Sequence, residues 1–229
     1  MTIRDLKGVV EDSIPVQTVL VSVFDKSGLE EFIPGLVALN PRIRFLSTGG
    51  TYGQIRGILD NPGEGTLLSI EKYTGFPEME GGLVKTLHPK IHAGILAERN
   101  NLEHQRFLQE MNAEHIDMVV VNLYPFEKVI ESPGVTFEHA RGNVDIGGPT
   151  MLRAAAKNFP SCAAVCDPFD YVRILQQLKE TGGSTSFNQR LGLAKKVFAR
   201  TFMYDNIVAN YFSIEADPEK VRPQYKFRE

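Results

Sequence analysis

A run of adjacent apolar residues in the middle of the chain, HIDMVVVNL at 115–123, limits most strongly what this chain can fold into. The run is rich in β-branched residues without polar alternation, which is typical of a strand buried on both faces of a parallel sheet. Shorter apolar segments predict strands at 17–24, 42–47 and 161–166, with 66–70 as a candidate further element. Apolar residues at helical spacing predict helices at 26–39, 50–59, 101–112, 149–158, 167–180 and 187–212.

The strands and helices alternate along the sequence, and this order predicts a doubly wound α/β domain, a parallel sheet flanked by helices. Parallel neighbours need crossover connections, and right-handed crossovers place helices on both faces of the sheet. We therefore expect one domain over 17–213, between an N-terminal tail (1–16) and a C-terminal tail (214–229). The long helix at 187–212 carries one apolar stripe, which must pack against the domain or against a second subunit.

Charge and hydropathy exclude two classes of partner. The formal net charge is -3 and no basic stripe is visible, so no nucleic-acid partner is expected. The longest apolar run near the start, 19–24, is too short to span a bilayer and follows an acidic segment. We therefore expect no membrane partner and a cytoplasmic protein.

The cysteines and histidines predict neither a disulfide nor a metal site. Cys162 and Cys166 lie four positions apart in a predicted strand, about 13 Å from each other, whereas a disulfide needs Cα atoms within about 7 Å. Two thiols in such a strand suit a reducing compartment. His88 and His92 are interrupted by Pro89 and have no third ligand at metal spacing.

Loops at the carboxyl ends of the strands are the candidate functional segments, because ligands of open parallel sheets bind there. The first loop, SVFDKSG, leads into a helix start where Lys26 adds a full positive charge for a phosphate. Alternatively, Asp25 or Ser27 only caps the helix. The second, LSTGGTYG, offers paired glycines with the hydroxyls of Thr48 and Thr51, which suit either an anion or a plain tight turn. Its spacing matches neither GxGxxG nor a Walker A loop.

Two further loops carry polar side chains at the same edge. YTGFPEMEGGLVKTLHPKIH has no sustained period, and long loops inside a compact domain are often functional. Lys85 and Thr86 are its phosphate-seeking residues, although most lysines are simply solvated. NLYPF leaves the strongest strand, where Asn122 and Tyr124 either face a ligand or form a hydrophobic corner.

The fifth segment, DIGGPTMLRAAAKN at 145–158, begins a helix with glycine and proline. Backbone N–H groups around Ile146–Gly148 suit an oxyanion. The Lys157 side chain leans back towards the helix start and covers part of the distance to Asp145. Alternatively, this is an alanine-rich helix packed on the sheet, with an exposed lysine at its C-terminal end.

These motifs, together with YDNIVANYF near the C-terminus, resemble the N-terminal IMP cyclohydrolase domain of the bifunctional AICAR transformylase/IMP cyclohydrolase of purine biosynthesis. The resemblance covers about 19–212. It implies a methylglyoxal-synthase-like fold and the dehydrative closure of 5-formamidoimidazole-4-carboxamide ribotide (FAICAR) to IMP. It implies a small-molecule nucleotide substrate and no metal or organic cofactor.

The resemblance also implies a set of site residues. The expected phosphate contacts are Ser22, Lys26, Thr48, Gly49, Gly50, Thr51, Lys85 and Thr86. The expected base-side and catalytic residues are Asn122, Tyr124, Asp145, Ile146 and Lys157, with Lys85 in catalysis as well, and Asp25 and Gly147 as further substrate contacts. In this interpretation Lys157 donates or shuttles a proton, Asp145 orients the amide nitrogen or accepts from it, and helix-start N–H groups stabilise the oxyanion.

This chain departs from the family pattern at two positions. Phe24 stands where the family usually has serine, and Leu83 where it has arginine, so a hydroxyl and a fork of five N–H donors are lost. The transformylase half cannot fit into 229 residues. Either the chain is a stand-alone cyclohydrolase that receives its substrate from a separate AICAR transformylase, or it is part of a longer chain. The long final helix makes a homodimer plausible.

Two other functions are alternatives to an IMP cyclohydrolase. A non-catalytic purine-nucleotide-binding regulatory module of the same fold would keep the phosphate loops without needing Asp145, Tyr124 and Lys157. A methylglyoxal synthase would share the fold, but the NLYPF and RAAAKN segments favour the cyclohydrolase.

Overall fold

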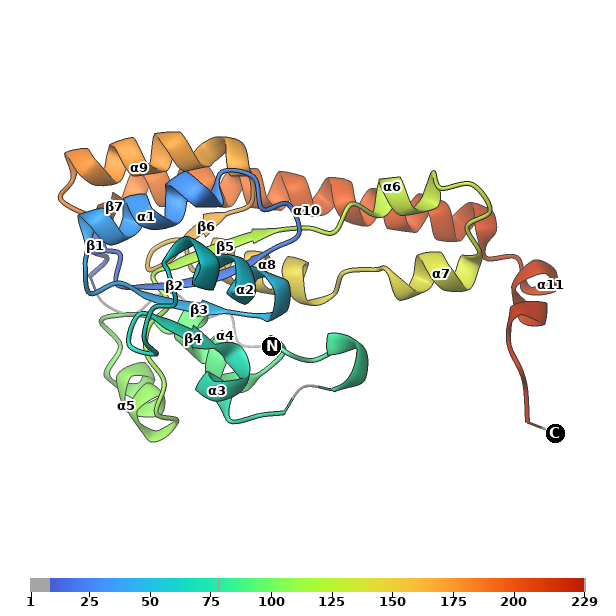
Figure 1. Cartoon of the computed structure of the whole chain (residues 1–229), viewed down its shortest axis with the longest axis horizontal. Coiled ribbons are helices and arrows are strands. Elements are labelled where there is room, and N and C mark those ends of the chain that lie inside the picture. Colours follow the sequence, from blue (N-terminus) through green and yellow to red (C-terminus); the bar gives the residue numbers. More distant parts are fainter. Residues whose placement is uncertain (1–8, 78, 229) are drawn as a thin grey trace.

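A computed structural model describes residues 9–77 and 79–228 of the chain, which fold around a five-stranded parallel sheet (Figure 1). The strand order is β4-β3-β2-β5-β6, and every neighbouring pair is parallel. The strands are β2 (Thr18–Val23), β3 (Arg44–Ser47), β4 (Leu67–Ser69), β5 (Met118–Asn122) and β6 (Ala163–Val165). The predicted α/β fold class is therefore confirmed, and residues 66–70 contain a strand.

The strand order reverses between β2 and β5, at the centre of the sheet. From β2 the chain proceeds outward through β3 to β4, then returns to the other side of β2 with β5 and continues to β6. Val119 and Val120 of β5 are fully buried, as the β-branched run predicts. Loops that leave β2 and β5 diverge at such a reversal and open a crevice between them.

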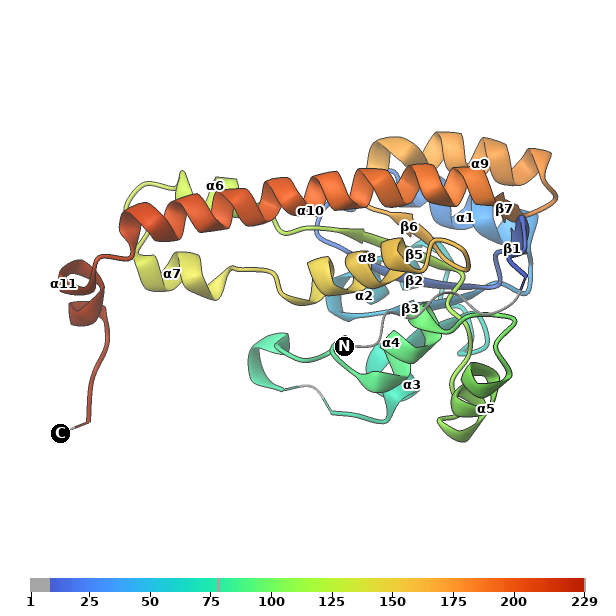
Figure 2. The same ribbon diagram turned by 180° about the vertical axis from the view of Figure 1, so that it is seen from behind.

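Helices cover both faces of the sheet (Figures 1 and 2). One apolar cluster joins Val19 and Val21 to α1 (Leu29–Leu39), α2 (Gly49–Ile58) and α9 (Tyr171–Glu180). The second joins Leu20 to α3 (Ile70–Thr74), α4 (Pro89–Leu96) and α8 (Gly147–Lys157). Successive residues of β2 thus face opposite layers, as the pleat of a strand requires.

The long helix α10 (Phe187–Glu215) runs along the β6 edge and projects beyond the sheet (Figure 2). Its distal half packs on α6 (Phe126–Ile130) and α7 (Phe137–Gly142). Neither short helix was predicted, because five or six residues are too few to show a helical period. Phe198 and Phe202 on α10 remain exposed, so the stripe is only partly covered by its own domain. No helix in the described part of the chain is long and apolar enough to cross a membrane.

Both expected tails contain structure within the described residues, so these domain limits need correction. β1 (Ser13–Pro15) pairs antiparallel with β7 (Ser184–Ser186), and Ile14 is fully buried. At the other end, α10 continues to Glu215 and is followed by α11 (Pro218–Val221) and η3 (Arg222–Gln224). The sequence gives no signal for β1 and β7, since each has only three residues and their partners are remote.

The segment at 73–92 is less irregular than its composition suggests. α4 starts at Pro89, where the His88 side chain accepts the N–H of Lys90 at 3.1 Å and so caps the helix.

The remaining short elements are η1 (Glu80–Gly82), α5 (Leu102–Glu110) and η2 (Pro168–Asp170). Cys162 and Cys166 are buried free thiols, as expected, and burial raises the pKa of both.

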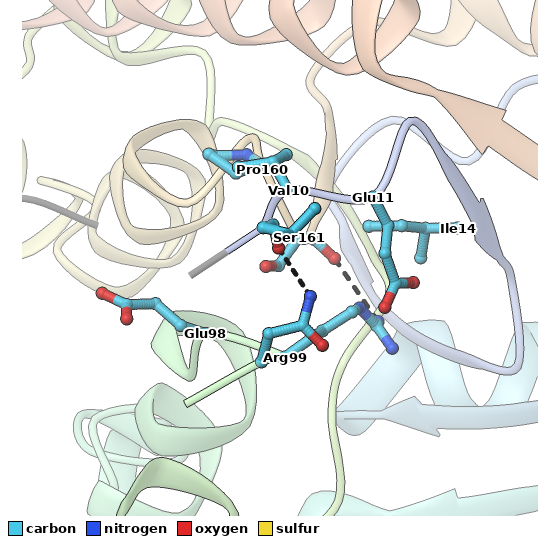
Figure 3. A pocket seen from close by; sticks show the side chains of 9 residues that line it. Val10, Glu11, Ile14, Glu98, Arg99, Pro160 and Ser161 are labelled. Atoms are coloured by element: carbon cyan, nitrogen blue, oxygen red, sulfur yellow. Dashed lines mark hydrogen bonds between the residues drawn. The ribbon is translucent and has the colours of Figure 1, made fainter. Parts of the chain in front are cut away.

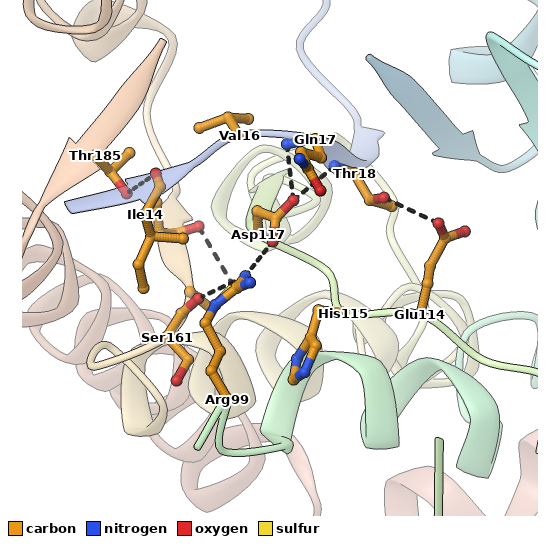
Figure 4. A network of polar contacts seen from close by, with 12 residues as sticks. Ile14, Val16, Gln17, Thr18, Arg99, Glu114, His115, Asp117, Ser161 and Thr185 are labelled. Atoms are coloured by element: carbon orange, nitrogen blue, oxygen red, sulfur yellow. Dashed lines mark hydrogen bonds and ion pairs between the residues drawn. The ribbon is translucent and has the colours of Figure 1, made fainter. Parts of the chain in front are cut away.

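A buried polar network holds the amino ends of the strands (Figure 4). The Asp117 carboxylate accepts the backbone N–H groups of Gln17 and Thr18, both at 2.7 Å, and forms an ion pair with Arg99. Arg99 also borders a hollow of about 10 Å³ beneath Glu11 (Figure 3). That space suits about one water molecule, so this edge is structural.

Arg190 of α10 fastens the N-terminal segment to the domain. Its side chain is fully buried and donates hydrogen bonds to five backbone carbonyls, those of Glu11, Asp12, Phe159, Pro160 and Thr185. Carbonyls from three separate parts of the chain therefore depend on one guanidinium, which offers five N–H donors in a fixed fork.

We expect Arg190→Met to lower the free energy of unfolding by about 3 kcal/mol or more, because several buried carbonyls lose their donors at once. Urea unfolding measures this change. The control is Arg200→Met, at an exposed position of the same helix, which should change stability by less than about 0.5 kcal/mol. Equal losses in the two variants would show that Arg190 does not hold these segments together.

Candidate active site

A cavity of about 640 Å³ opens at the carboxyl edge of the sheet, where the strand order reverses. Five segments line it: the loop after β2, the start of α2, the 81–86 segment, the loop after β5 and the start of α8. These are the five segments that the sequence predicts to be functional. The volume lies in the range of about 300–1,000 Å³ that is usual for small-molecule sites.

One end of the cavity is built around the start of α2. Thr48 precedes the helix, and its hydroxyl lies 3.2 Å from the hydroxyl of Ser22 on β2. Gly49 and Gly50 open the helix, and the first N–H groups of a helix have no partner within it. Exposed glycine backbone beside two hydroxyls forms a suitable surface for an anion.

Two ammonium groups converge on these glycines. A Cβ atom built on Gly49 would lie 3.5 Å from the Nζ atom of Lys85, and one on Gly50 would lie 3.9 Å from that of Lys26. Gly49 also has a φ of 46°, a region that L-residues rarely adopt. The positive φ favours glycine at position 49, and the combined positive charge of the two lysines favours a phosphate-like ligand.

Three of the expected substrate contacts make hydrogen bonds within the protein. The Thr51 hydroxyl bonds both the N–H and the carbonyl of Val23, at 3.1 and 3.0 Å, and so ties α2 to β2. The Asn122 side chain accepts the N–H groups of Phe24 and Asp25 and donates to the Asp25 carbonyl, all within 2.9 Å. Asn122 borders the cavity, but its amide is engaged in shaping the first loop.

Asp25 is the third of these residues, and its carboxylate does not line the cavity. It accepts the N–H of Ser27 at 2.9 Å, and hydrogen bonding from Ser27 lowers the pKa of the carboxyl below its usual value. The simpler interpretation of this residue, a local turn that leads into α1, is therefore the one the structure supports.

The start of α8 carries the cavity's carboxylate. The Asp145 side chain accepts the N–H of Gly148 at 2.8 Å, while its backbone N–H donates to the Tyr204 hydroxyl at 2.7 Å. The N–H of Gly148, one of the expected oxyanion donors, is therefore already hydrogen-bonded to Asp145. The other expected donors, the N–H groups of Ile146 and Gly147, lie at the same helix start. Tyr204 was missed, because a tyrosine within a long amphipathic helix carries no local signal of a site.

Two glycines make this close packing possible. A Cβ atom on Gly148 would lie 2.4 Å from Oδ2 of Asp145, and one on Gly147 would lie 2.7 Å from Oγ1 of Thr86. Real Cβ atoms are not found at such distances, so any side chain would push these groups away. The Thr86 segment and the α8 start are thus held in direct contact.

Part of the cavity lining is apolar. Tyr124 and Phe24 contact each other edge to face, with ring centroids 4.5 Å apart. Leu83 and Ile146 add exposed aliphatic side chains. The lining therefore combines cations, apolar side chains and the Asp145 carboxylate.

Lys157 is not brought to the cavity. It is exposed at the C-terminal end of α8, ten residues from the Gly147 start, or about 15 Å along the axis. A lysine side chain leaning back covers less than half of that length, and no bend of α8 supplies the rest. The alternative interpretation of this residue, an exposed lysine that complements the helix dipole, matches the structure.

The histidines of the 73–92 segment also have structural roles. His88 caps α4, and burial lowers the pKa of His92. Within residues 9–77 and 79–228, no three His, Cys, Asp or Glu side chains are grouped so as to hold a metal ion.

An open parallel sheet with a cavity lined by two lysines and several glycines at its reversal point defines the class of this chain, and the comparisons identify the family. The family model "MGS-like domain" matches 28–150, and "AICARFT/IMPCHase bienzyme" matches 155–228. The chain belongs to the family of MGS-like domains. The resemblance to the cyclohydrolase part of the bifunctional enzyme is confirmed by the second model and by the relatives.

The relatives include proteins called "Bifunctional purine biosynthesis protein PurH". That of Magnetococcus marinus is 47% identical over 199 residues, 86% of this chain and 36% of its own length. That of Streptococcus pyogenes serotype M3 is 47% identical over 213 residues, 92% of this chain and 40% of its own. This chain therefore spans about two fifths of the length of these curated relatives.

The crystal structure of ForH is also similar. Its TM-score is 0.73 and its sequence identity 36%, over 86% of this chain and 97% of that one. The similarity to ForH thus extends over nearly all of a solved chain.

We expect Gly148→Ala to lower the free energy of unfolding by about 1–3 kcal/mol, because the added methyl displaces the Asp145 carboxylate and meets Leu123 at 3.0 Å. Gly53→Ala is the matched control, since a Cβ there meets nothing within 4 Å and alanine favours the helix. Thermal and urea unfolding of both variants measure the difference. A Gly148→Ala protein as stable as Gly53→Ala would contradict the packing described for the α8 start.

Proposed function

We propose that this chain is an IMP cyclohydrolase, which closes the ring of FAICAR to give IMP and water. The observation that carries the proposal is the cavity lining, which combines two lysines at the start of α2 with Tyr124 and Asp145. The similarity to purine biosynthesis proteins supports it.

In this proposal the phosphate of the ribotide lies against Gly49 and Gly50. Lys26 and Lys85 neutralise its charge, and the hydroxyls of Ser22 and Thr48 donate hydrogen bonds. Thr86 completes this side through its contact with Gly147. Binding energy from the phosphate then holds the imidazole and its two substituents in a fixed place.

Ring closure is intramolecular, so correct orientation supplies most of the rate enhancement. The carboxamide nitrogen attacks the formyl carbon, a C–N bond forms, and the formyl oxygen leaves as water. The two protons of that water come from the carboxamide nitrogen and the formamido nitrogen. Several groups of the cavity fit the transfers that this requires.

Asp145 suits the role of proton acceptor and orienter for the carboxamide. One of its oxygens is fixed by the N–H of Gly148, which leaves the other for the amide nitrogen. The N–H groups of Ile146 and Gly147 suit the developing oxyanion. Lys85 and Tyr124 are the candidate proton donors to the departing oxygen. Lys157 has no part in this proposal, because it lies at the far end of α8.

The proposal extends to partners. A separate AICAR transformylase would supply the formylated substrate. A homodimer would cover exposed apolar side chains of α10, among them Phe198, Phe202 and Met203.

The direct test is to add FAICAR to the purified protein and follow the ultraviolet absorption of IMP. We expect catalytic formation of IMP at micromolar enzyme. If folded protein binds IMP but forms none, the regulatory module is the better description. If it neither forms nor binds IMP, the cavity has another ligand.

Variants test the two ends of the cavity separately. Lys26→Met removes a charge from the phosphate end and should raise KM about tenfold. Tyr124→Phe removes a proton donor and should lower kcat about 10- to 100-fold with a smaller change in KM. Lys195→Met, at an exposed position of α10, is the control and should match the wild type. A Tyr124→Phe enzyme with full kcat would exclude proton donation by Tyr124.

A further inference from the structure

Four exposed apolar side chains from four different segments meet in the cavity. They are Phe24 after β2, Leu83 before β5, Tyr124 after β5 and Ile146 at the start of α8, with exposed fractions of 47, 68, 37 and 59%. Single exposed apolar residues are normal on a protein surface. Four that converge in one concave site instead indicate a surface that a ligand covers.

Phe24 is held in a defined position within this group. Its N–H donates to Oδ1 of Asn122 at 2.8 Å, and its carbonyl accepts from Nζ of Lys26 at 3.3 Å. Its ring contacts Tyr124 at an interplanar angle of 67°. The same loop therefore holds both the Phe24 ring and Lys26, one of the two lysines of the cavity lining.

The cavity lining contains few cations. Lys26 and Lys85 are the cations among its described lining residues, and Lys85 approaches Gly49 while Lys26 approaches Gly50. Leu83 adds an exposed apolar side chain to this lining and no further charge. With both ammonium groups at the glycines, a second negative charge on a ligand would be desolvated without a cation of its own.

We propose that Phe24 and Leu83 determine specificity, by forming a wall that accepts a flat, uncharged heteroaromatic ring and disfavours a ring that carries a negative charge. This inference rests on the proposed function, because it takes a ribotide phosphate as the occupant of the lysine end. Phe24 contacts the face or edge of the ring, and Leu83 replaces a charged contact with an apolar one.

The test compares two ligands that share the phosphate end. Calorimetry measures the affinities of IMP and of ribose 5-phosphate, which lacks the ring. Phe24→Ala should weaken IMP about tenfold, the size of one base–aromatic stacking contact, and leave ribose 5-phosphate unchanged within about twofold. Phe24→Tyr, which keeps the ring, should bind IMP nearly as tightly as the wild type.

Phe169→Ala is the matched control, because Phe169 is 93% exposed and lies outside the cavity. It should leave both affinities unchanged. An equal loss for both ligands in Phe24→Ala would overturn the proposal, since Phe24 would then act only through the phosphate loop. An unchanged IMP affinity would overturn it as well.

Leu83 is tested with orotidine 5′-monophosphate, whose ring carries a carboxylate. The wild type should bind IMP at least about tenfold more tightly, and Leu83→Arg should reduce that ratio by pairing the carboxylate. A ratio that Leu83→Arg does not change contradicts the role of Leu83. If the wild type converts FAICAR but the variants do not behave as expected, only the role of Phe24 and Leu83 in specificity is refuted. If the wild type neither binds IMP nor converts FAICAR, the proposed function and this inference are both refuted.

Discussion

The parallel pairing of β2 with β5 is the constraint on which the site depends. Val19 pairs with Met118, and the register continues to Val23 beside Asn122, so both strands end at the same level. The chain leaves these ends in opposite directions, which separates the following loops and opens the crevice. Asn122 then reaches across to hold the Phe24–Asp25 backbone. The register of the two strands thereby sets the geometry of the cavity.

Close backbone packing completes the cavity from the other side. Glycines at the start of α8 let Thr86 and Asp145 approach the main chain at distances no side chain would permit, whereas Lys26 and Lys85 lie at ordinary contact distances from the start of α2. The Tyr204 hydroxyl accepts the N–H of Asp145, so α10 helps to position the carboxylate even though it lies outside the sheet. The cavity lining thus combines two ammonium groups, a carboxylate and apolar side chains, which the proposed chemistry uses to orient the reacting groups.

Much of this was predictable because buried strands and loop composition are local signals. The run at 115–123 and the glycine-containing loops predicted the sheet and the five segments around the cavity. Other features depend on remote partners: the pairing of β1 with β7, the Arg190 contacts, and the engagement of Asn122 and Thr51 by the first loop. Lys157 was expected in the site from the family resemblance, but it is not among the residues that line the cavity, since it stands ten residues from the start of α8. Sequence spacing identifies the segments that form a site. Which polar groups of those segments are already hydrogen-bonded depends on how the chain packs.

The most direct test of the account is a crystal structure of the protein with IMP. The account predicts the phosphate at Gly49–Gly50 between the ammonium groups of Lys26 and Lys85, and the purine beside Phe24 and Tyr124 with Asp145 near its amide edge. A nucleotide bound elsewhere, or bound with its phosphate at the apolar end, would contradict it.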